Sequence, residues 1–279
     1  MNILVITHND LDGAGSAAVV KVCHPNDTLN FIPTAHDVLD DLTEVAFTSL
    51  RESAIDLLIF TDISPSLSRI QQIRDENLEV IILDHHKHSD WADPEARVGV
   101  RGAYGVERCG TTLAAAYFDK DSLLFQDVLN AIEAWDLWKL EDPLRGKGES
   151  LNKLHSLIGT VRMREYLQDV LTGTASLEVS WVLDCALQHD KSYARKRADA
   201  AVIETDSEGN TYAVTHVGRA ELNGNVGGIL ATKDTYAMLL NPEEGTISLR
   251  SVNEGVDVGR IAKQRGGGGH HNAAGYPLK

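Results

Sequence analysis

The sequence has 279 residues, which is enough for one large domain or for two modest ones that each bury a core. It contains 41 acidic and 26 basic residues, so its formal net charge is 15 negative. This balance argues against a protein that coats long nucleic acids, because neutralising many phosphates requires many Lys and Arg side chains. A short anionic ligand held by metals and a few local cations remains compatible with it.

Cysteine usage and hydropathy indicate the compartment. Cys23, Cys109 and Cys185 are odd in number and widely scattered, which fits free thiols in a reducing cytoplasm better than a disulfide framework. The N-terminal run Met1–Thr7 lacks the basic segment and the longer apolar core of a signal peptide. No apolar stretch approaches the ~20 residues that cross a bilayer. We therefore expect a soluble, cytoplasmic protein that does not bind membranes.

The first half of the chain alternates strand-like and helix-like runs. Strands are predicted over residues 3–6, 55–60 and 79–83, and helices over 13–22 and from an N-cap at Ser64 onward. Nearly continuous apolar strands between helices are typical of a parallel sheet covered on both faces. Ligands gather at the carboxyl ends of such strands, so we expect the residues that follow the three strands to converge in space: His8, Asp62 and Asp84.

The rest of the chain divides into a helical part and a second α/β part. Residues 109–205 are mainly helix-like, with Asp136 near the end of one helix and a polar loop over 143–150. Strand signals return at 211–217, 236–240 and 246–251, with helical segments at 226–231 and 258–264. The predicted fold is therefore α/β, in three parts: a parallel-sheet domain over 1–175, a helical connector over 176–205 and a smaller α/β domain over 206–279.

Two acidic segments follow predicted strands. In an extended segment the side chains of His8, Asp10 and Asp12 would share one side, with Gly13 allowing a tight turn into the next helix. A solvated turn with a helix-capping aspartate is the alternative, and Asp62 could likewise cap the helix that follows it. The triplet 84–86 (DHH) is harder to explain as surface, because three ionisable side chains closing an apolar strand are costly if buried without partners.

At this point the chain resembles the DHH phosphoesterase family. The segments that carry the resemblance occur in order along nearly the whole chain: HNDLDG at 8–13, FTDIS at 60–64, LDHH at 83–86, EAWD at 133–136, SLRS at 248–251 and GGGGHHNAAG at 266–275, the last two being typical of the DHH-associated C-terminal domain. The resemblance implies a parallel-sheet catalytic domain, a substrate-binding C-terminal domain and metal-dependent hydrolysis of phosphoesters.

The resemblance also implies roles for individual residues. Asp10 would hold one metal ion, Asp12 the other, and Asp62 both, with His85 and Asp136 completing the second site. His8 is a further predicted ligand, although it lies two residues before Asp10, whereas many relatives have a histidine four residues before the first aspartate. The expected ions are two Mn²⁺, with Mg²⁺ or Co²⁺ as substitutes.

Two more residues of the triplet have predicted roles outside the metal sites. His86 would face the scissile phosphate as a hydrogen-bond donor to developing charge, and Asp84 would orient an imidazole. No covalent enzyme intermediate is needed, because two ions can activate water for direct attack on phosphorus.

A second set of residues is predicted to hold the substrate. Consecutive glycines permit close backbone approach to an anion, although four glycines alone would also suit a flexible linker. The resemblance implies that the glycine motif binds the non-reacting end of the substrate, and that the SLRS element holds a further phosphate oxygen. An exposed Arg at a strand end is otherwise simply solvated. The predicted substrate-binding residues are Arg250, Ser251, Gly267, Gly268, Gly269 and His270, with His271 and Asn272 as further candidates.

Aromatic and remaining histidine residues are less informative. Trp91, Trp135 and Trp138 could stack a base, but core packing is the better interpretation for Trp135 and Trp138. His36 and His88 have no partner pattern and are not assigned.

The leading functional hypothesis is a two-metal phosphodiesterase that hydrolyses short oligoribonucleotides to nucleoside monophosphates, with short RNA oligonucleotides or dinucleotides as partners. The alternative is a phosphodiesterase for linear or cyclic dinucleotides. A pyrophosphatase or exopolyphosphatase would be expected to carry more Lys and Arg, and a non-catalytic nucleotide sensor would not need so many neighbouring carboxylates. The sequence allows a homodimer.

Overall fold

The computed structural model describes residues 1–119, 126–175 and 181–278. By its internal contacts the chain forms two compact units, Met1–Glu178 and Val179–Lys279, which are described separately below. The division into a catalytic domain, a connector and a substrate-binding domain at the predicted boundaries stays a proposal. In the described part of the chain, no helix combines the length and apolar character needed to cross a membrane. Cys23 and Cys109 are free thiols, whereas the side chain of Cys185 lies outside the described residues.

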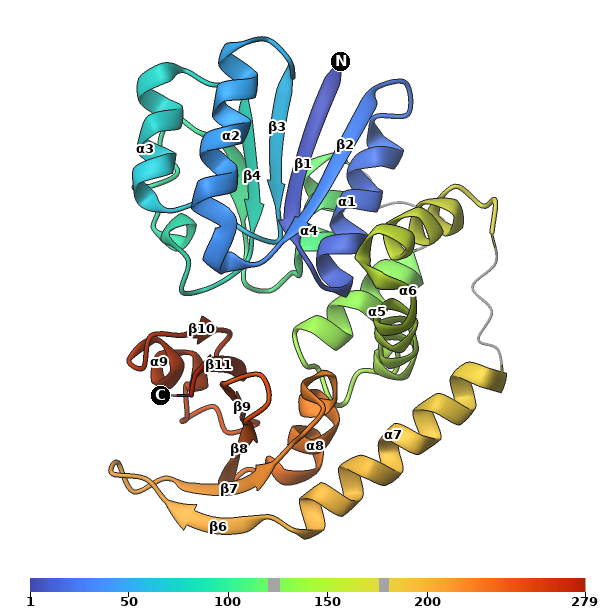
Figure 1. Ribbon diagram of the computed structural model, residues 1–279, viewed down its shortest axis with the longest axis vertical. Coiled ribbons are helices and arrows are strands. Elements are labelled where there is room, and N and C mark those ends of the chain that lie inside the picture. Colours follow the sequence, from blue (N-terminus) through green and yellow to red (C-terminus); the bar gives the residue numbers. More distant parts are fainter. Residues whose placement is uncertain (120–125, 176–180, 279) are drawn as a thin grey trace. The chain divides into compact units, whose positions relative to one another are not determined.

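The first unit contains a five-stranded parallel sheet in the order β2-β1-β3-β4-β5, which confirms the predicted fold class (Figure 1). Its strands are β1 (Asn2–His8), β2 (Thr28–Thr34), β3 (Leu57–Thr61), β4 (Val80–Asp84) and β5 (Arg101–Tyr104). The chain leaves β1 first toward β2 and then returns to β3 on its other side, so the strand order reverses between β1 and β3. Such a point in a parallel sheet is where a ligand site is expected.

Helices cover both faces of this sheet, and side chains alternate between the two cores along each strand. Ile3 and Val5 face one core, whereas Leu4 and Ile6 face the other. The helices of the first core are α1 (Leu11–Cys23), α4 (Gly110–Tyr117), α5 (Gln126–Asp136) and α6 (Arg145–Leu171). The helices of the second core are α2 (Leu39–Arg51) and α3 (Leu67–Glu76). The first unit also contains two short 3₁₀ turns, η1 (His36–Val38) and η2 (Asp90–Ala92).

Two boundaries in the first unit differ from the prediction. Helix α3 begins at Leu67 with Ser66 at its N-cap, because the hydroxyl of Ser64 donates instead to Asp84, at 2.7 Å. The segment predicted as a loop, 143–150, is mostly the start of α6. Within α6, Gly159 has a φ of 79°, and this left-handed conformation breaks the helix into two parts.

The second unit contains a six-stranded sheet in the order β10-β11-β9-β8-β7-β6, in which β7 and β8 are parallel and the other described pairs are antiparallel. Its strands are β6 (Val202–Thr205), β7 (Thr211–His216), β8 (Thr235–Asn241), β9 (Thr246–Arg250), β10 (Gly268–Gly269) and β11 (Ala273–Pro277). Its helices are α7 (Trp181–Asp199), η3 (Ala220–Leu222), α8 (Asn223–Leu230) and α9 (Val258–Lys263). This unit confirms the second α/β part.

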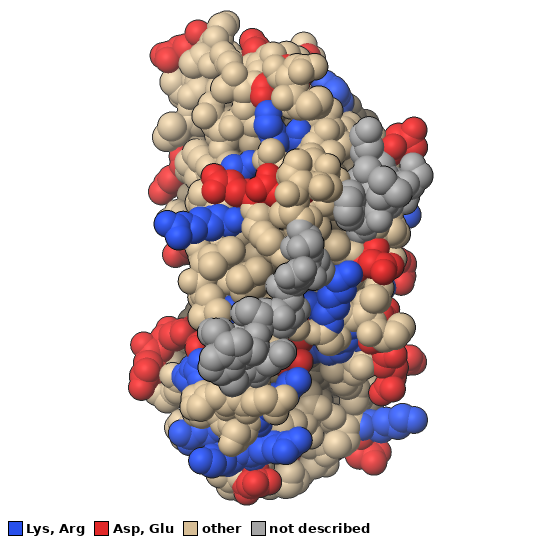
Figure 2. Space-filling view, turned by 90° about the vertical axis from the view of Figure 1, so that its right-hand side faces the viewer, with Lys and Arg blue, Asp and Glu red and all other residues tan. Residues whose placement is uncertain are grey.

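The surface carries both signs of charge. On the face drawn in Figure 2, Lys and Arg side chains are interspersed with Asp and Glu side chains.

Candidate metal centre

The segment after β1 forms the first side of the centre. Asp10 is the N-cap of α1, where its Oδ1 accepts a hydrogen bond of 2.9 Å from the Gly13 N–H. The other oxygen of Asp10, Oδ2, lies 2.7 Å from Nδ1 of His8. Asp12 is the second residue of α1, so the expectation of an extended His8–Asp12 segment is wrong. The helix begins early because the side chain of Asp10 caps it.

Glycines in α1 serve a different purpose from the turn that we predicted. A Cβ atom at Gly13 would lie 2.0 Å from the carbonyl oxygen of His8, and one at Gly15 would lie 2.3 Å from Oγ1 of Thr111. Both positions lie inside the helix and require a residue without a side chain. These glycines therefore let α1 pack tightly against the end of β1 and the start of α4.

The carboxylate of Asp62 lies at the end of β3, the strand next to β1. Asp62 has a φ of 57°, in the left-handed region that a non-glycine residue adopts at a cost of about 1–2 kcal/mol. Its backbone N–H donates to the Leu83 carbonyl at 2.8 Å, and its Oδ1 lies 2.9 Å from Nε2 of His85. The other oxygen, Oδ2, is buried and accepts no hydrogen bond from the described residues. A buried carboxylate oxygen in this state is a ready ligand for a cation.

The last residue of β4, Asp84, organises the histidine pair that follows it. Its Oδ1 accepts from the backbone N–H of His85 at 2.8 Å and lies 2.7 Å from Nδ1 of His86, while its Oδ2 accepts from the Ser64 hydroxyl. Burial alone would raise the pKa of Asp84, but the charge and hydrogen bond of His86 outweigh it, so this pKa is lowered. Asp84 is therefore an ionised acceptor that fixes the ring of His86.

The N-terminus of α4 holds Asp12, a connection between positions about a hundred residues apart. Backbone N–H groups of Gly110 and Thr111 donate to the two carboxylate oxygens of Asp12 at 2.5 and 2.8 Å. A Cβ atom at Gly110 would lie 2.6 Å from Cβ of Asp62, so only glycine fits between the two carboxylates. The negative charge of Asp12 also suits a helix N-terminus.

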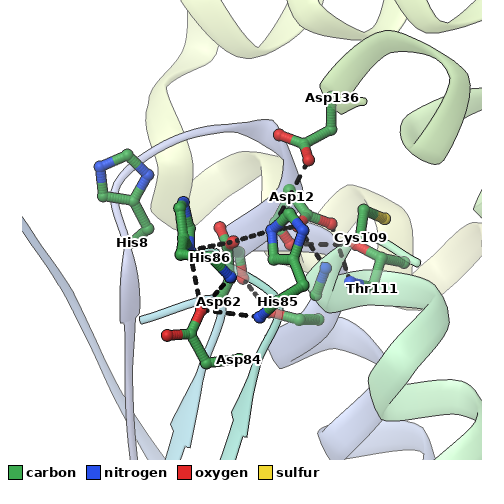
Figure 3. Close-up of polar contacts among 12 residues, drawn as sticks. His8, Asp12, Asp62, Asp84, His85, His86, Cys109, Thr111 and Asp136 are labelled. Atoms are coloured by element: carbon green, nitrogen blue, oxygen red, sulfur yellow. Dashed lines mark hydrogen bonds and ion pairs between the residues drawn. The ribbon is translucent and has the colours of Figure 1, made fainter. Parts of the chain in front are cut away.

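His85 lies in the middle of the carboxylates (Figure 3). Besides Asp62, its Nε2 lies 3.5 Å from Oδ2 of Asp12 and 3.6 Å from Oδ2 of Asp136, which reaches in from the last residue of α5. Burial, with help from the neighbouring His86, lowers the pKa of His85 to about 4. The ring is therefore neutral at pH 7, the form in which an imidazole binds a metal ion.

Two carboxylates of the centre, Asp62 and Asp136, have raised pKa values. Burial first, and then the charges of Asp12 and Asp10, raise the pKa of Asp62 and of Asp136 well above the ordinary range. Carboxylates crowded in this way are stabilised when a cation takes the place of protons. The residues present therefore fit divalent metal ions, which prefer oxygen ligands with an occasional imidazole.

Asp62 is common to two groups of side chains that could each hold an ion. One group is His8, Asp10 and Asp62, the other is Asp12, Asp62 and His85, and in each the ligand atoms lie within 4.8 Å of one another. Asp136 adds a carboxylate beside His85 in the second group. All six side chains predicted as metal ligands thus meet at the carboxyl edge of the sheet.

Two further side chains lie close to the centre: the thiol of Cys109 and the imidazole of His36. Cys109, the N-cap of α4, is buried, and burial raises the pKa of its thiol well above the usual value, so it is a poor nucleophile. The ring of His36, after β2, lies 5.4 Å from that of His8 and 5.8 Å from that of His86, measured between centroids. No local motif marks His36, because only the pairing of β2 with β1 brings it here.

The predicted substrate-binding residues of the second unit lie on two adjacent segments. Strands β9 and β11 pair so that Arg250 is opposite Ala273, and the N–H of Ser251 donates to the Asn272 carbonyl at 2.9 Å. The Arg250 side chain donates to the Ser248 hydroxyl at 2.8 Å, and Ser251 is buried. The end of the SLRS segment and the turn around His270 therefore lie side by side. The further candidate His271 pairs with Asp257 at 3.5 Å.

The glycine run has a packing role that we did not predict. A Cβ atom at Gly267 would lie 2.0 Å from the carbonyl oxygen of Gly275, and one at Gly269 would lie 2.6 Å from that of Ala273. These two glycines allow close packing against β11. A Cβ atom at Gly268, in contrast, would meet nothing within 4 Å. Of the three predicted anion-binding glycines, Gly268 is therefore the one whose surroundings are open.

Trp91, Trp135 and Trp138 all pack inside the first unit. Trp91 is fully buried and its indole N–H donates to the Ala103 carbonyl at 3.0 Å, so stacking on a base is excluded. Trp138 is also buried, and Trp135 packs against the first core with the Arg145 guanidinium 4.8 Å above its ring.

Comparisons with known proteins agree with this arrangement. Residues 2–134 match the family model described as the DHH family, N-terminal domain. The chain is 23% identical to the oligoribonuclease NrnB of Bacillus subtilis (strain 168) over an alignment of 291 positions. This alignment covers 98% of this chain and 72% of that protein.

Solved structures share the fold at low sequence identity. RecJ of Thermus thermophilus in complex with Mn²⁺ has a TM-score of 0.59 at 15% identity, covering 100% of this chain and 49% of that chain. The pGpG-specific phosphodiesterase PggH of Vibrio cholerae has a TM-score of 0.52 at 12% identity, covering 99% of this chain and 92% of that chain. Together with the converging motifs, the family match places residues 2–134 of this chain in the N-terminal domain of the DHH family.

Proposed function

We propose that this protein is a metal-dependent phosphodiesterase that hydrolyses short oligoribonucleotides to nucleoside monophosphates. The observation that carries the proposal is the sharing of buried Asp62 by two groups of potential metal ligands at the carboxyl edge of a DHH-family sheet. Similarity to a protein named oligoribonuclease supports the substrate class. The net charge of 15 negative favours short substrates over long strands.

Asp62 and five further side chains would hold two divalent ions in this proposal. His8 and Asp10 would serve one ion, Asp12, His85 and Asp136 the other, and Asp62 would serve both. Bound divalent ions supply activated water and stabilise charge on the attacking and leaving oxygens. Mn²⁺ is the proposed ion, with Mg²⁺ or Co²⁺ as substitutes. The similar RecJ protein has been solved in complex with Mn²⁺ and in complex with Mg²⁺.

The histidine after His85 would act on the substrate itself. Asp84 engages Nδ1 of His86 at 2.7 Å, which fixes the orientation of the ring. Burial would lower the pKa of His86, but the charge of Asp84 outweighs it, so this pKa is raised and the ring keeps its protons more readily. His86 is suited to donate a hydrogen bond to charge that develops on the scissile phosphate.

The second unit would hold the end of the substrate that does not react. Arg250, Ser251 and the turn over 267–270 are the proposed binding residues, and their proximity within one sheet supports the assignment. Gly268 offers backbone without a side chain in open surroundings. A homodimer remains a prediction that gel filtration with light scattering would check.

A second candidate function is hydrolysis of linear or cyclic dinucleotides. The similar fold of a protein named pGpG-specific phosphodiesterase favours it, and a linear dinucleotide is also the shortest substrate of the first proposal. Pyrophosphate or polyphosphate hydrolysis and non-catalytic nucleotide sensing are less favoured.

The test is hydrolysis by the purified full chain of a 5′-phosphorylated diribonucleotide, with pyrophosphate and a cyclic dinucleotide in parallel. We expect nucleoside monophosphates in Mn²⁺ and none after EDTA treatment. The proposal would be contradicted if pyrophosphate were hydrolysed and neither nucleotide were. It would also be contradicted if the diribonucleotide bound in Mn²⁺ but were not hydrolysed.

A further inference from the structure

A third imidazole lies next to His8 and His86 at the carboxyl edge of the sheet. The centroids of the three rings are 5.4 Å apart for His8 and His36, 5.8 Å for His36 and His86, and 6.5 Å for His8 and His86. The three residues come from three strands or the turns that follow them, β1, β2 and β4. Three separate strands thus bring their imidazoles together in a triangle.

The register of the sheet explains why His36 reaches the centre. In the parallel pairing of β1 with β2, the last pair is His8 opposite Thr34. Beyond the strands, Asp10 follows His8 by two residues and His36 follows Thr34 by two residues. Asp10 is a predicted metal ligand, and His36 follows β2 at the same end of the sheet. The position of His36 is therefore set by the same sheet edge that positions the carboxylates.

No structural role accounts for the polar atoms of His36. Its side chain is exposed, and the described residues give its ring no hydrogen bond and no ion pair. His8 and His86, in contrast, each have Nδ1 engaged by a carboxylate, Asp10 and Asp84 respectively. His36 is also absent from the groups of described residues that could hold a metal ion. An exposed imidazole beside the centre, outside the potential ligand groups, is placed to meet what binds there.

We propose that His36 contacts the substrate by donating a hydrogen bond from its ring to a non-bridging oxygen of the phosphodiester being cleaved. This inference rests on the proposed function and adds a residue from the turn after β2 to the site. An imidazole N–H is a suitable donor to a phosphate oxygen. The competing explanation is a positioning role, in which the ring of His36 only holds that of His8 in place.

The test compares His36→Ala and His36→Gln in the full chain on a 5′-phosphorylated diribonucleotide at saturating Mn²⁺. A hydrogen bond to a charged group predicts a fall in kcat/KM of about 10- to 100-fold for His36→Ala. The amide of His36→Gln should restore part of that loss. Val38→Ala, in the same turn and half exposed, is the matched control and should behave as wild type.

Two further readouts separate substrate contact from positioning of His8. Mn²⁺ affinity, measured from the electron paramagnetic resonance signal of the free ion, should change less than about twofold in His36→Ala, because His36 is not a ligand. Phosphorothioate diribonucleotides carry sulfur at one or the other non-bridging position, and sulfur accepts hydrogen bonds poorly. For one diastereomer, the loss caused by His36→Ala should therefore shrink to about threefold or less.

Three outcomes would overturn the inference. They are wild-type kinetics for His36→Ala, a loss of Mn²⁺ affinity as large as the loss of activity, and an equal loss on both phosphorothioate diastereomers and on the oxygen substrate. Failure of the proposed function would be seen separately, because the wild-type protein would then leave the diribonucleotide intact in Mn²⁺ and the inference would fall with it.

Discussion

The Nε2 atom of His85 lies 2.9 Å from the Oδ1 atom of Asp62, and both residues are only 1% exposed. Asp62 follows β3 and His85 follows β4, so the pair joins two neighbouring strands at the carboxyl edge of the sheet. The remaining oxygen of Asp62 accepts no hydrogen bond from the part of the chain that the structure describes. This carboxylate is therefore the residue on which the proposed metal centre depends most.

Replacing Asp62 with Ala should abolish Mn²⁺-dependent turnover, because among the described residues Asp62 is the carboxylate common to both potential sites. The loss of several kcal/mol of transition-state stabilisation corresponds to a fall in kcat of about 10³-fold or more. Steady-state kinetics with a diribonucleotide measures this, and circular dichroism shows whether the variant folds. Near-normal activity in a folded variant would rule out the shared-ligand assignment.

Metal binding should stabilise the protein more strongly as the pH rises. The raised pKa values of Asp62 and Asp136 mean that the metal-free folded state holds protons that the unfolded state has released. Their contribution to the free energy of unfolding is thus present at low pH and lost as the pH rises from about 4 through the raised values. Ions that replace these protons remove the repulsion, so the Mn²⁺-induced increase in Tm should grow with pH.

Thermal unfolding at a series of pH values between about 5 and 8, with EDTA or with Mn²⁺, measures this effect. The double variant Asp62→Asn, Asp136→Asn is the control, because its side chains keep their size and do not ionise. It should show a flatter pH dependence without metal and little response to Mn²⁺. A Mn²⁺-induced Tm increase that is the same at every pH would contradict the account.

Two neighbouring glycines of the second unit should respond differently to the same substitution. Gly267→Ala places a Cβ atom 2.0 Å from the Gly275 carbonyl oxygen, and we expect a destabilisation of roughly 1–3 kcal/mol. Gly268→Ala meets open space and should leave the free energy of unfolding nearly unchanged, while weakening binding of short RNA. Chemical denaturation and a binding titration measure the two effects. Equal destabilisation of both variants would show that this packing description is wrong.

The role of His270 can be separated from the chemistry of hydrolysis. His270→Ala should raise KM for short RNA by about tenfold, the effect of one lost hydrogen bond to a charged group, while hydrolysis of a small generic phosphodiester stays near the wild-type rate. His216→Ala, which removes an exposed histidine of the same unit, is the matched control. If the two substrates lose activity equally in His270→Ala, the glycine motif does not bind the end of the substrate.

The sequence predicted the elements whose apolar runs are unbroken. Strands β1, β3 and β4 were recognised because their residues are buried almost throughout. Strand β2 was missed because it is half exposed and contains Pro33, and β5 because it has four residues including Gly102. Edge strands of this kind lack the pattern by which a buried strand is recognised.

The site was predictable where chemistry is local and not where it depends on tertiary contacts. All six predicted metal ligands converge, because the carboxyl ends of parallel strands meet at one edge. Nothing in the sequence links Asp12 to the N–H groups of Gly110 and Thr111, which come from another part of the fold. The sequence gives His36 no role for the same reason, since the pairing of β1 with β2 is what places it beside His8.

The most direct test of the central claim is a digest, in Mn²⁺, of 5′-labelled RNAs from two to about twenty nucleotides, with a cyclic dinucleotide alongside. The account predicts that diribonucleotides and other short RNAs are converted to nucleoside monophosphates fastest and that the rate falls with length. Rapid opening of the cyclic dinucleotide with little action on RNA, or no product from any of these substrates in Mn²⁺, would contradict it.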